Sequence, residues 1–405
     1  MTPATTASRP DLFDLDLFAD GPPHDLFRRL RAEAPVCFLP EPGGPGYWGV
    51  FTYDDLIEVS RHPQTFGSHP NTMIRDPDDD STETSAAGEL MLNQDPPRHT
   101  QLRKLVNKGF TPRQISALEP RIRERVVAIL DASAAKGTFD LVTDVAVEVP
   151  LQVIAELVGV PEDERHQVFT WTERMMSLDD PEMGGTLEDA RTAIAEMFAY
   201  ADRLAAERNA GDGTDLLSVL LRAEVDGDRL TTVDVDLFFM LLMNAGSETT
   251  RNLITGGTLA LFEHPDERER LTREPELLPT AIEEMLRWVT PVTHFRRTAR
   301  ADTVLAGQTI RAGDKVVMWY ASANRDDAHF ADPDRFDVGR DPNEHVAFGA
   351  GGPHFCLGAS LARLEARVMF EELLQRMPGL VPAGPAKRLG SNFINGITSL
   401  PVRAD

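Results

Sequence analysis

The sequence has only two cysteines, Cys37 and Cys356, among its 405 residues. At most one disulfide bond is possible, and a chain of this length does not need one to fold, so each cysteine requires its own explanation. Cys37 lies in the short apolar segment PVCFLP and is expected to be a small apolar residue on a strand. Cys356 instead follows a glycine-rich stretch directly.

Basic residues are also scarce: 41 Lys and Arg oppose 65 Asp and Glu, which gives a formal net charge of -24. Nucleic acids and anionic membranes would repel such a surface, so neither is expected as a principal partner. The first residues, MTPATTASRPDLFDLDLFAD, have neither the basic nor the apolar region of a signal peptide. We therefore expect a cytoplasmic protein without a membrane anchor.

The residues that are present indicate an ordinary globular protein, because 41% are hydrophobic. No linker-like segment or abrupt change of composition interrupts the chain, which predicts one domain over residues 1–405. Short strand patterns occur in a β-rich part at roughly 35–70 and again at 293–299, 303–310 and 314–322, whereas residues 111–222 show helical spacing of apolar residues. The predicted fold class is mainly α with small β-sheets.

A long helix is predicted from the threonine cap of TTVDVDLFFMLLMNAGSETTRNLITGGTLALFEHP to the residue before Pro265. Its apolar run, residues 237–243, is too short to span a membrane, which indicates a helix through the protein interior. Within it, Ala245 and Gly246 remove bulk, while Glu248 and Thr249 add an acid and an alcohol. This segment is either a notch for a neighbouring helix or a proton relay beside a bound group.

A second polar cluster is suggested by EEMLR, which places Glu284 and Arg287 three residues apart on one helix face. Such pairs commonly lie on solvated faces. The apolar neighbours of this pair, and a second arginine at Arg335 in DPDRF, indicate instead a buried carboxylate held by two arginines. The sequence leaves both placements open.

The segment FGAGGPHFCLGA, residues 348–359, places Cys356 just before a helix that carries an apolar stripe. Backbone N–H groups and the helix dipole there favour a thiolate and are expected to lower the pKa of the cysteine. A nucleophile, a disulfide exchanger or a metal ligand would each use such a thiolate. A nearby thiol partner and further zinc ligands are missing, whereas haem iron needs only one axial thiolate from the protein.

In their order and spacing, AGSETT, EEMLR, DPDRF and FGAGGPHFCLGA resemble the motifs of bacterial cytochromes P450, the haem-thiolate monooxygenases. A weaker match, DPPRHTQLRKLVNKGFTP, lies upstream, and the resemblance covers nearly the whole chain. It implies the cytochrome P450 fold, with haem b between the long central helix and the cysteine-loop helix.

The resemblance also implies roles for individual residues. Cys356 would be the axial iron ligand, with Phe348 beside the sulfur and with Gly352 and Gly358 allowing close approach of the backbone. The other residues expected to bind haem are Ala245, Gly246 and the propionate-binding residues His99, Arg103, Arg297 and His354. Glu248 and Thr249 match the acid–alcohol pair of dioxygen activation. The triad of Glu284, Arg287 and Arg335 would be structural.

The implied reaction is hydroxylation or epoxidation by a monomeric enzyme that uses dioxygen and two electrons from a ferredoxin and its reductase. Two alternatives are a haem-binding sensor or carrier without turnover and a hydrolase that uses Cys356 with His354. The acid–alcohol pair disfavours a sensor, and a hydrolase leaves Glu248 and Arg287 without a role.

The cysteine loop is one residue longer than the commoner form of the family, and together with SNFINGI it resembles bacterial members that hydroxylate steroids, terpenoids or methyl-branched lipids. The expected substrate is a bulky apolar molecule, such as a steroid, terpenoid, fatty acid or macrolide. The candidate substrate-pocket residues are Met91, Met175, Met176, Phe239, Leu242, Val292 and Phe393. A basic stretch with no acidic residue, comprising Arg98, Arg103, Lys104, Lys108 and Arg113, is hypothesised to steer an acidic ferredoxin.

Overall fold

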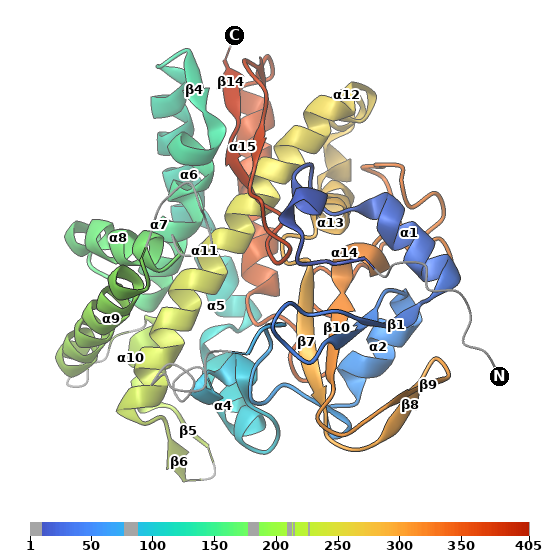
Figure 1. Cartoon of the computed structure of the whole chain (residues 1–405). Coiled ribbons are helices and arrows are strands. Elements are labelled where there is room, and N and C mark those ends of the chain that lie inside the picture. Colours follow the sequence, from blue (N-terminus) through green and yellow to red (C-terminus); the bar gives the residue numbers. More distant parts are fainter. Residues whose placement is uncertain are drawn as a thin grey trace.

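The structure, a computed structural model, describes residues 10–76, 88–176, 186–208, 213, 215–225 and 227–404. Helices dominate it (Figure 1). Their bounds are α1 His24–Glu33, α2 Tyr53–Arg61, α4 Arg98–Val106, α5 Pro112–Ala117, α6 Glu119–Ala134, α7 Glu148–Val158, α8 Arg165–Met176, α9 Leu187–Arg208, α10 Leu216–Arg222, α11 Thr232–Glu263, α12 Pro265–Arg273, α13 Leu278–Val289, α14 Tyr320–Ala323 and α15 Ala359–Arg376.

The largest sheet has five strands in the order β1-β2-β10-β7-β3. These strands are β1 Val36–Leu39, β2 Tyr47–Val50, β3 Phe66–Gly67, β7 His294–Ala299 and β10 Lys315–Trp319. The parallel pairing of β10 with β2 joins two segments that lie far apart in the sequence. Smaller sheets are formed by β4 Thr138–Asp140 with β11 Val381–Pro382 and β14 Pro401–Arg403, and by the pairs β5 Glu224–Val225 with β6 Asp228–Arg229, β8 Thr303–Leu305 with β9 Gln308–Ile310, and β12 Lys387–Arg388 with β13 Ile397–Ser399.

The predicted long helix is confirmed as α11, a helix of 32 residues that runs diagonally through the molecule in Figure 1. It begins at a capping box, in which the Thr231 hydroxyl accepts from the Asp234 N–H and the Asp234 carboxylate accepts from the Thr231 N–H. It ends before Pro265, as the sequence predicts. Within the described ranges, no helix is both long and apolar enough to cross a membrane.

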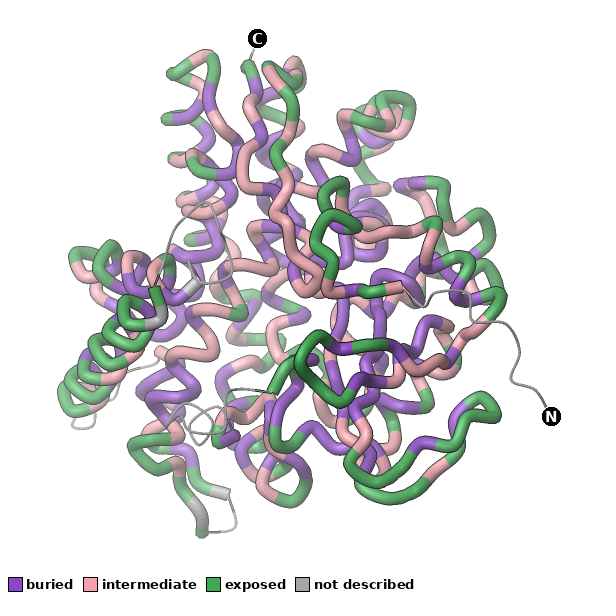
Figure 2. Tube along the Cα trace, in the orientation of Figure 1, coloured by how far each residue is buried: buried purple, intermediate pink, exposed green. Residues whose placement is uncertain are grey.

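The main apolar core lies where α11 contacts α7, α13 and α15, and two smaller clusters lie on the five-stranded sheet. Figure 2 shows buried residues along these central elements, whereas the outer side of α9 is exposed. The predicted class, mainly α with small β-sheets, is confirmed. The sequence pattern missed β4, whose partner β14 comes from the far end of the chain. Because its partner lies so far along the chain, the local sequence around β4 does not indicate a strand.

Candidate active site

A cavity of about 240 Å³ is lined by residues of α4, α11, α13, β7, α14, α15 and the cysteine loop, which we define as residues 348–358. The predicted site residues that line it are Met91, His99, Arg103, Leu242, Ala245, Gly246, Thr249, Val292, Arg297, Phe348, His354, Cys356 and Gly358. The structure thus brings together residues from widely separated motifs. Five other predicted site residues are not among the described residues that line the cavity: Glu248, Gly352, Met175, Phe239 and Phe393.

The cysteine loop turns tightly so that Cys356 faces the cavity. The Cys356 N–H donates to the Phe348 carbonyl at 2.9 Å, which closes the loop. Gly352 adopts a positive φ of 76°, and a Cβ added there would lie 2.4 Å from the Ser60 carbonyl oxygen. Only glycine fits at this position, because the backbone of α2 approaches too closely for a side chain.

Two effects act on the Cys356 thiol. Cys356 is exposed and lines the cavity. Desolvation by the surrounding protein raises the pKa of its thiol, contrary to the expectation from sequence. Backbone N–H groups of Gly358 and Ala359, together with the Arg103 guanidinium, act in the opposite direction but are outweighed. Their orientation toward the sulfur is nevertheless the one that a thiolate ligand requires.

Four cationic or imidazole side chains line the same cavity. Burial lowers the pKa values of Arg103 and Arg297, and among the described residues neither guanidinium has a carboxylate within 4.0 Å. The His99 and His354 rings lie 4.0 Å apart between centroids. Burial and the nearby arginines lower the pKa of His99 to about 4 and that of His354 to about 2.

These residues fit haem b. A buried arginine without an anion is costly, and the carboxylates of haem would supply the missing partners for Arg103 and Arg297. The His99 Nδ1 atom is buried without a hydrogen-bond partner among the described residues, so it too has a free bonding position. A single thiolate that faces the cavity matches an iron whose other ligands come from a porphyrin.

The cavity-facing side of α11 follows helical spacing. Phe238, Leu241, Leu242, Ala245, Gly246, Thr249, Thr250 and Leu253 form this side. The Thr249 hydroxyl donates to the Ala245 carbonyl at 2.8 Å, so it bonds to the preceding turn as the sequence suggested. The Glu248 carboxylate instead accepts from Arg251 and, at 3.0 Å, from Asn252, away from the cavity wall.

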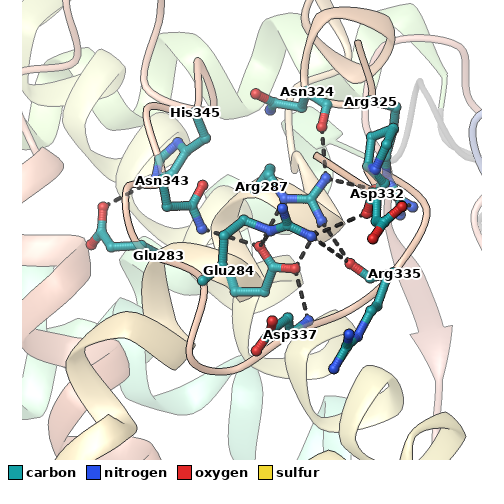
Figure 3. Close-up of polar contacts among 12 residues, drawn as sticks. Glu283, Glu284, Arg287, Asn324, Arg325, Asp332, Arg335, Asp337, Asn343 and His345 are labelled. Atoms are coloured by element: carbon teal, nitrogen blue, oxygen red, sulfur yellow. Dashed lines mark hydrogen bonds and ion pairs between the residues drawn. The ribbon is translucent and has the colours of Figure 1, made fainter. Parts of the chain in front are cut away.

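The predicted buried carboxylate is found at Glu284, whose side chain is 0% exposed, as is that of Arg287. Two bonds of 2.7 and 2.8 Å join the two residues. The third member of the predicted triad requires a correction. The Arg335 side chain is 62% exposed and turns away in Figure 3, and only its carbonyl accepts from Arg287. Arg340 takes its place and donates to Glu284 at 3.1 Å.

The predicted substrate residues divide into two groups. Met91, Leu242 and Val292 line the cavity, whereas Met175 lies in the helical core. Phe239 packs on Tyr200 with 5.9 Å between ring centroids, because adjacent helical residues point about 100° apart and Phe238 takes the cavity side. Phe393 packs against the cavity residue Phe295, with 5.6 Å between ring centroids. The side chain of Met176 lies outside the described residues.

Several cavity residues were not predicted from sequence. They include Phe110, Phe238, Phe295, Tyr320 and Glu365. Helical spacing places Phe238 on the same side of α11 as Thr249, so this pattern would have identified it. The helical spacing that follows the cysteine loop would likewise have identified Glu365 on α15. The others lie on connections and strand ends without such a pattern.

The Nε2 atom of His354 forms a hydrogen bond with the Ser68 hydroxyl at 3.0 Å. This contact gives no support to the alternative of a hydrolase in which His354 activates Cys356.

Comparison with known proteins agrees with this site. The family described as Cytochrome P450 matches residues 17–384. The chain is 42% identical to the methyl-branched lipid omega-hydroxylase of Mycobacterium tuberculosis, over 97% of this chain and 94% of the relative. It is also 42% identical to the steroid C26-monooxygenase of Rhodococcus jostii, over 97% of this chain and 84% of that relative.

A solved structure shares the whole fold. A cytochrome P450 of Mycobacterium marinum in complex with pseudoionone superposes with a TM-score of 0.91 and 39% identity, over 100% of this chain and 99% of that chain. Matches of this length and identity, on a chain whose cysteine loop and central helix meet at one cavity, identify the protein. The chain belongs to the cytochrome P450 family and is a P450 monooxygenase.

Proposed function

We propose that this enzyme hydroxylates a bulky apolar small molecule, of the class of a steroid, a terpenoid or a methyl-branched lipid. The observation that carries the proposal is that Cys356, Thr249 and an apolar wall share one cavity. The apolar wall includes Phe110, Phe238, Leu241, Leu242, Val292 and Phe295. Such a wall binds hydrocarbon and offers few polar groups for orienting a polar substrate. The activities named for the relatives fall in the same chemical range.

Haem b would be held by Cys356 through its sulfur and by the Arg103 and Arg297 guanidinium groups through its carboxylates. When bound, it supplies dioxygen activation. The N–H groups of Gly358 and Ala359 would hold the sulfur in place and temper its charge. His99 lines the same cavity, and its Nδ1 atom, which has no hydrogen-bond partner among the described residues, would offer a hydrogen bond to a carboxylate of haem.

The chain's own residues would also control protons and water. The Thr249 hydroxyl faces the cavity and would pass protons to the oxygen that leaves as water. Its bond to the Ala245 carbonyl fixes its rotamer and leaves the oxygen free to accept a proton. Release of the hydroxyl's own proton toward the cavity would then require that bond to break. The apolar side chains around it would exclude bulk water, so that protons arrive only through placed groups.

The test begins with the spectrum of the reduced, carbon-monoxide-bound enzyme. We expect the long-wavelength Soret band of thiolate-ligated haem in the parent protein and its loss in Cys356→Ser. Titration with a steroid, a terpenoid and a methyl-branched fatty acid should then shift the spin state of the haem for at least one class, with a hydroxylated product on turnover. A parent protein that binds haem without that band, or that forms no product with any class, would contradict the proposal.

We further propose that electrons come from an acidic ferredoxin that docks near α4. Lys104, Lys108 and Arg113 are exposed, whereas Arg98 pairs with Asp234 and Arg103 lines the cavity. The exposed cations therefore lie on the short segment that also reaches the haem site.

A single domain over residues 1–405 is supported by the five-stranded sheet, which combines β1 to β3 with β7 and β10. A cytoplasmic monomer stays a prediction.

A further inference from the structure

Glu283, the first glutamate of the EEMLR motif, lies beside Glu284 in the sequence but has a different partner. Its two carboxylate oxygens accept from the Nε and Nη2 atoms of Arg363 on α15, each at 2.7 Å. The buried His345 ring contacts the same carboxylate at 3.1 Å (Figure 3). Burial alone would raise the pKa of Glu283, but the hydrogen bonds from Arg363 and His345 lower it to about 2, so the carboxylate is charged at neutral pH.

Glu283 thereby fixes the Arg363 guanidinium over the ring of Phe348. The central carbon of the guanidinium lies 4.6 Å from the ring centroid, which is a cation–π contact. Phe348 lines the cavity, and its carbonyl accepts from the Cys356 N–H at 2.9 Å. The pair of Arg363 and Glu283 therefore presents its positive end to the loop that carries the thiol.

The charge of Arg363 also acts on the Cys356 sulfur. Desolvation raises the pKa of this thiol, and Arg363 is one of the positive groups that oppose the rise by favouring the thiolate. Arg103 acts in the same way, but it lines the cavity and would face a carboxylate of haem. Arg363 is not among the described residues that line the cavity, so its charge stays beside the cysteine loop when haem is bound.

We propose that Arg363, fixed by Glu283 over Phe348, is a positioning residue that raises the reduction potential of the bound haem. An electron-rich sulfur stabilises ferric iron, whereas a positive charge held at the cysteine loop stabilises the extra electron of ferrous iron. The affected step is the transfer of one electron from the ferredoxin, which is oxidised, to ferric iron, which becomes ferrous. This inference rests on the proposed function and deepens it, because it assigns residues to the reduction step.

The experiment measures the ferric–ferrous equilibrium of the holoenzyme by spectroelectrochemical titration. Arg363→Met removes the charge, and the same change combined with Glu283→Gln leaves no unpaired carboxylate behind. Arg363→Lys restores a positive charge without the two-bond geometry. The matched control is Arg367→Met, one turn further along α15, where the side chain is 33% exposed against 37% for Arg363 and pairs instead with Glu119 and Glu371.

We expect R363M to shift the equilibrium about tenfold toward the ferric form, which corresponds to a potential about 59 mV lower. The double variant should keep a shift of about threefold or more, because the cation–π contact is lost in both. R363K should lie between the parent and R363M, and R367M should equal the parent. The C–O stretching band of the reduced, carbon-monoxide-bound enzyme should move to lower frequency in R363M, because a more electron-rich thiolate increases back-donation from iron.

A potential in R363M equal to the parent's would overturn the proposal. A return to the parent's value in the double variant would also overturn it, because the shift would then come from an unpaired Glu283. An equal shift in R367M would assign the effect to total charge, and a potential in R363K as low as in R363M would exclude an electrostatic role. If R363M retains no haem, R363K decides, because its potential should still lie below the parent's. A parent enzyme without the thiolate Soret band would instead overturn the proposed function, so the two failures are distinguishable.

Discussion

Arg340 donates to the Glu284 carboxylate through its Nε atom at 3.1 Å, although Arg335 lies closer along the chain. Glu284 also accepts from Arg287, from the Asn343 side chain at 3.1 Å and from the Asp337 N–H at 2.9 Å (Figure 3). One buried carboxylate therefore holds α13 against the segment that leads into the cysteine loop. The position of Cys356 depends on this connection.

The first prediction tests which arginine has this role. Arg340→Ala removes a bond to a buried carboxylate and three bonds to carbonyl groups, so it should lower the free energy of unfolding by about 3 kcal/mol and reduce haem content. Arg335→Ala removes an exposed side chain and should cost less than about 1 kcal/mol. Urea unfolding and the haem-to-protein absorbance ratio measure both effects. A larger effect of Arg335→Ala would contradict the assignment.

The second prediction concerns the cysteine loop. Gly352→Ala would place a Cβ 2.4 Å from the Ser60 carbonyl, whereas Gly349→Ala, also at positive φ, meets no atom closer than 3.9 Å. Both variants bear the backbone strain of about 1 kcal/mol, but only the first adds a clash. Gly352→Ala should therefore have the lower melting temperature and lose haem faster. Equal behaviour of the two would show that strain alone matters at this loop.

Sequence predicted those parts of the site that depend on local spacing. The start and end of α11, the pair of Glu284 and Arg287 and the glycine-bounded Cys356 each have a pattern within one segment. Arg340 was missed because the loop that carries it has no periodicity, and its direction is set by contacts with Glu284 and with carbonyls of its own loop. The Glu365 Oε2 atom has no hydrogen-bond partner among the described residues. Its surroundings depend on how α15 packs against α11, and no single segment of the sequence encodes that packing.

The third prediction concerns the two arginines that line the cavity. Arg297→Met should speed haem loss about 10- to 100-fold, because a charged hydrogen bond to a carboxylate of haem is worth about 1.5–3 kcal/mol. The neighbouring Arg296, which pairs with Asp76, is the matched control on the same strand. Transfer of haem to an excess of apomyoglobin gives both rates. Faster loss from Arg296→Met than from Arg297→Met would contradict the haem contact.

The fourth prediction is a pH dependence from Glu365. Its pKa is raised in the folded protein, so above the usual carboxyl pKa the folded state retains a proton that the unfolded state has released. The contribution of this group to stability is complete below that usual pKa and falls as pH rises toward the folded value. The stability of Glu365→Gln relative to the parent should therefore increase with pH, by at most about 1.4 kcal/mol per unit. Urea unfolding of both proteins between pH 4 and pH 8, as an approximate range, measures this difference, and the opposite slope would contradict a neutral Glu365.

The last prediction concerns the approach of the electron donor. Lys104 and Lys108 are exposed on and just after α4, whose inner side reaches the cavity through His99 and Arg103. In a chain with a net charge of -24, local positive charge is needed to attract an acidic ferredoxin. Lys104→Glu with Lys108→Glu should slow reduction by ferredoxin about tenfold or more at low salt and flatten its salt dependence. Lys387→Glu with Arg403→Glu, at two exposed basic residues of the C-terminal strands, controls for net charge, because it also reverses two positive charges. If stopped-flow reduction slows equally in the control, the effect comes from total charge, and the docking site is not at α4.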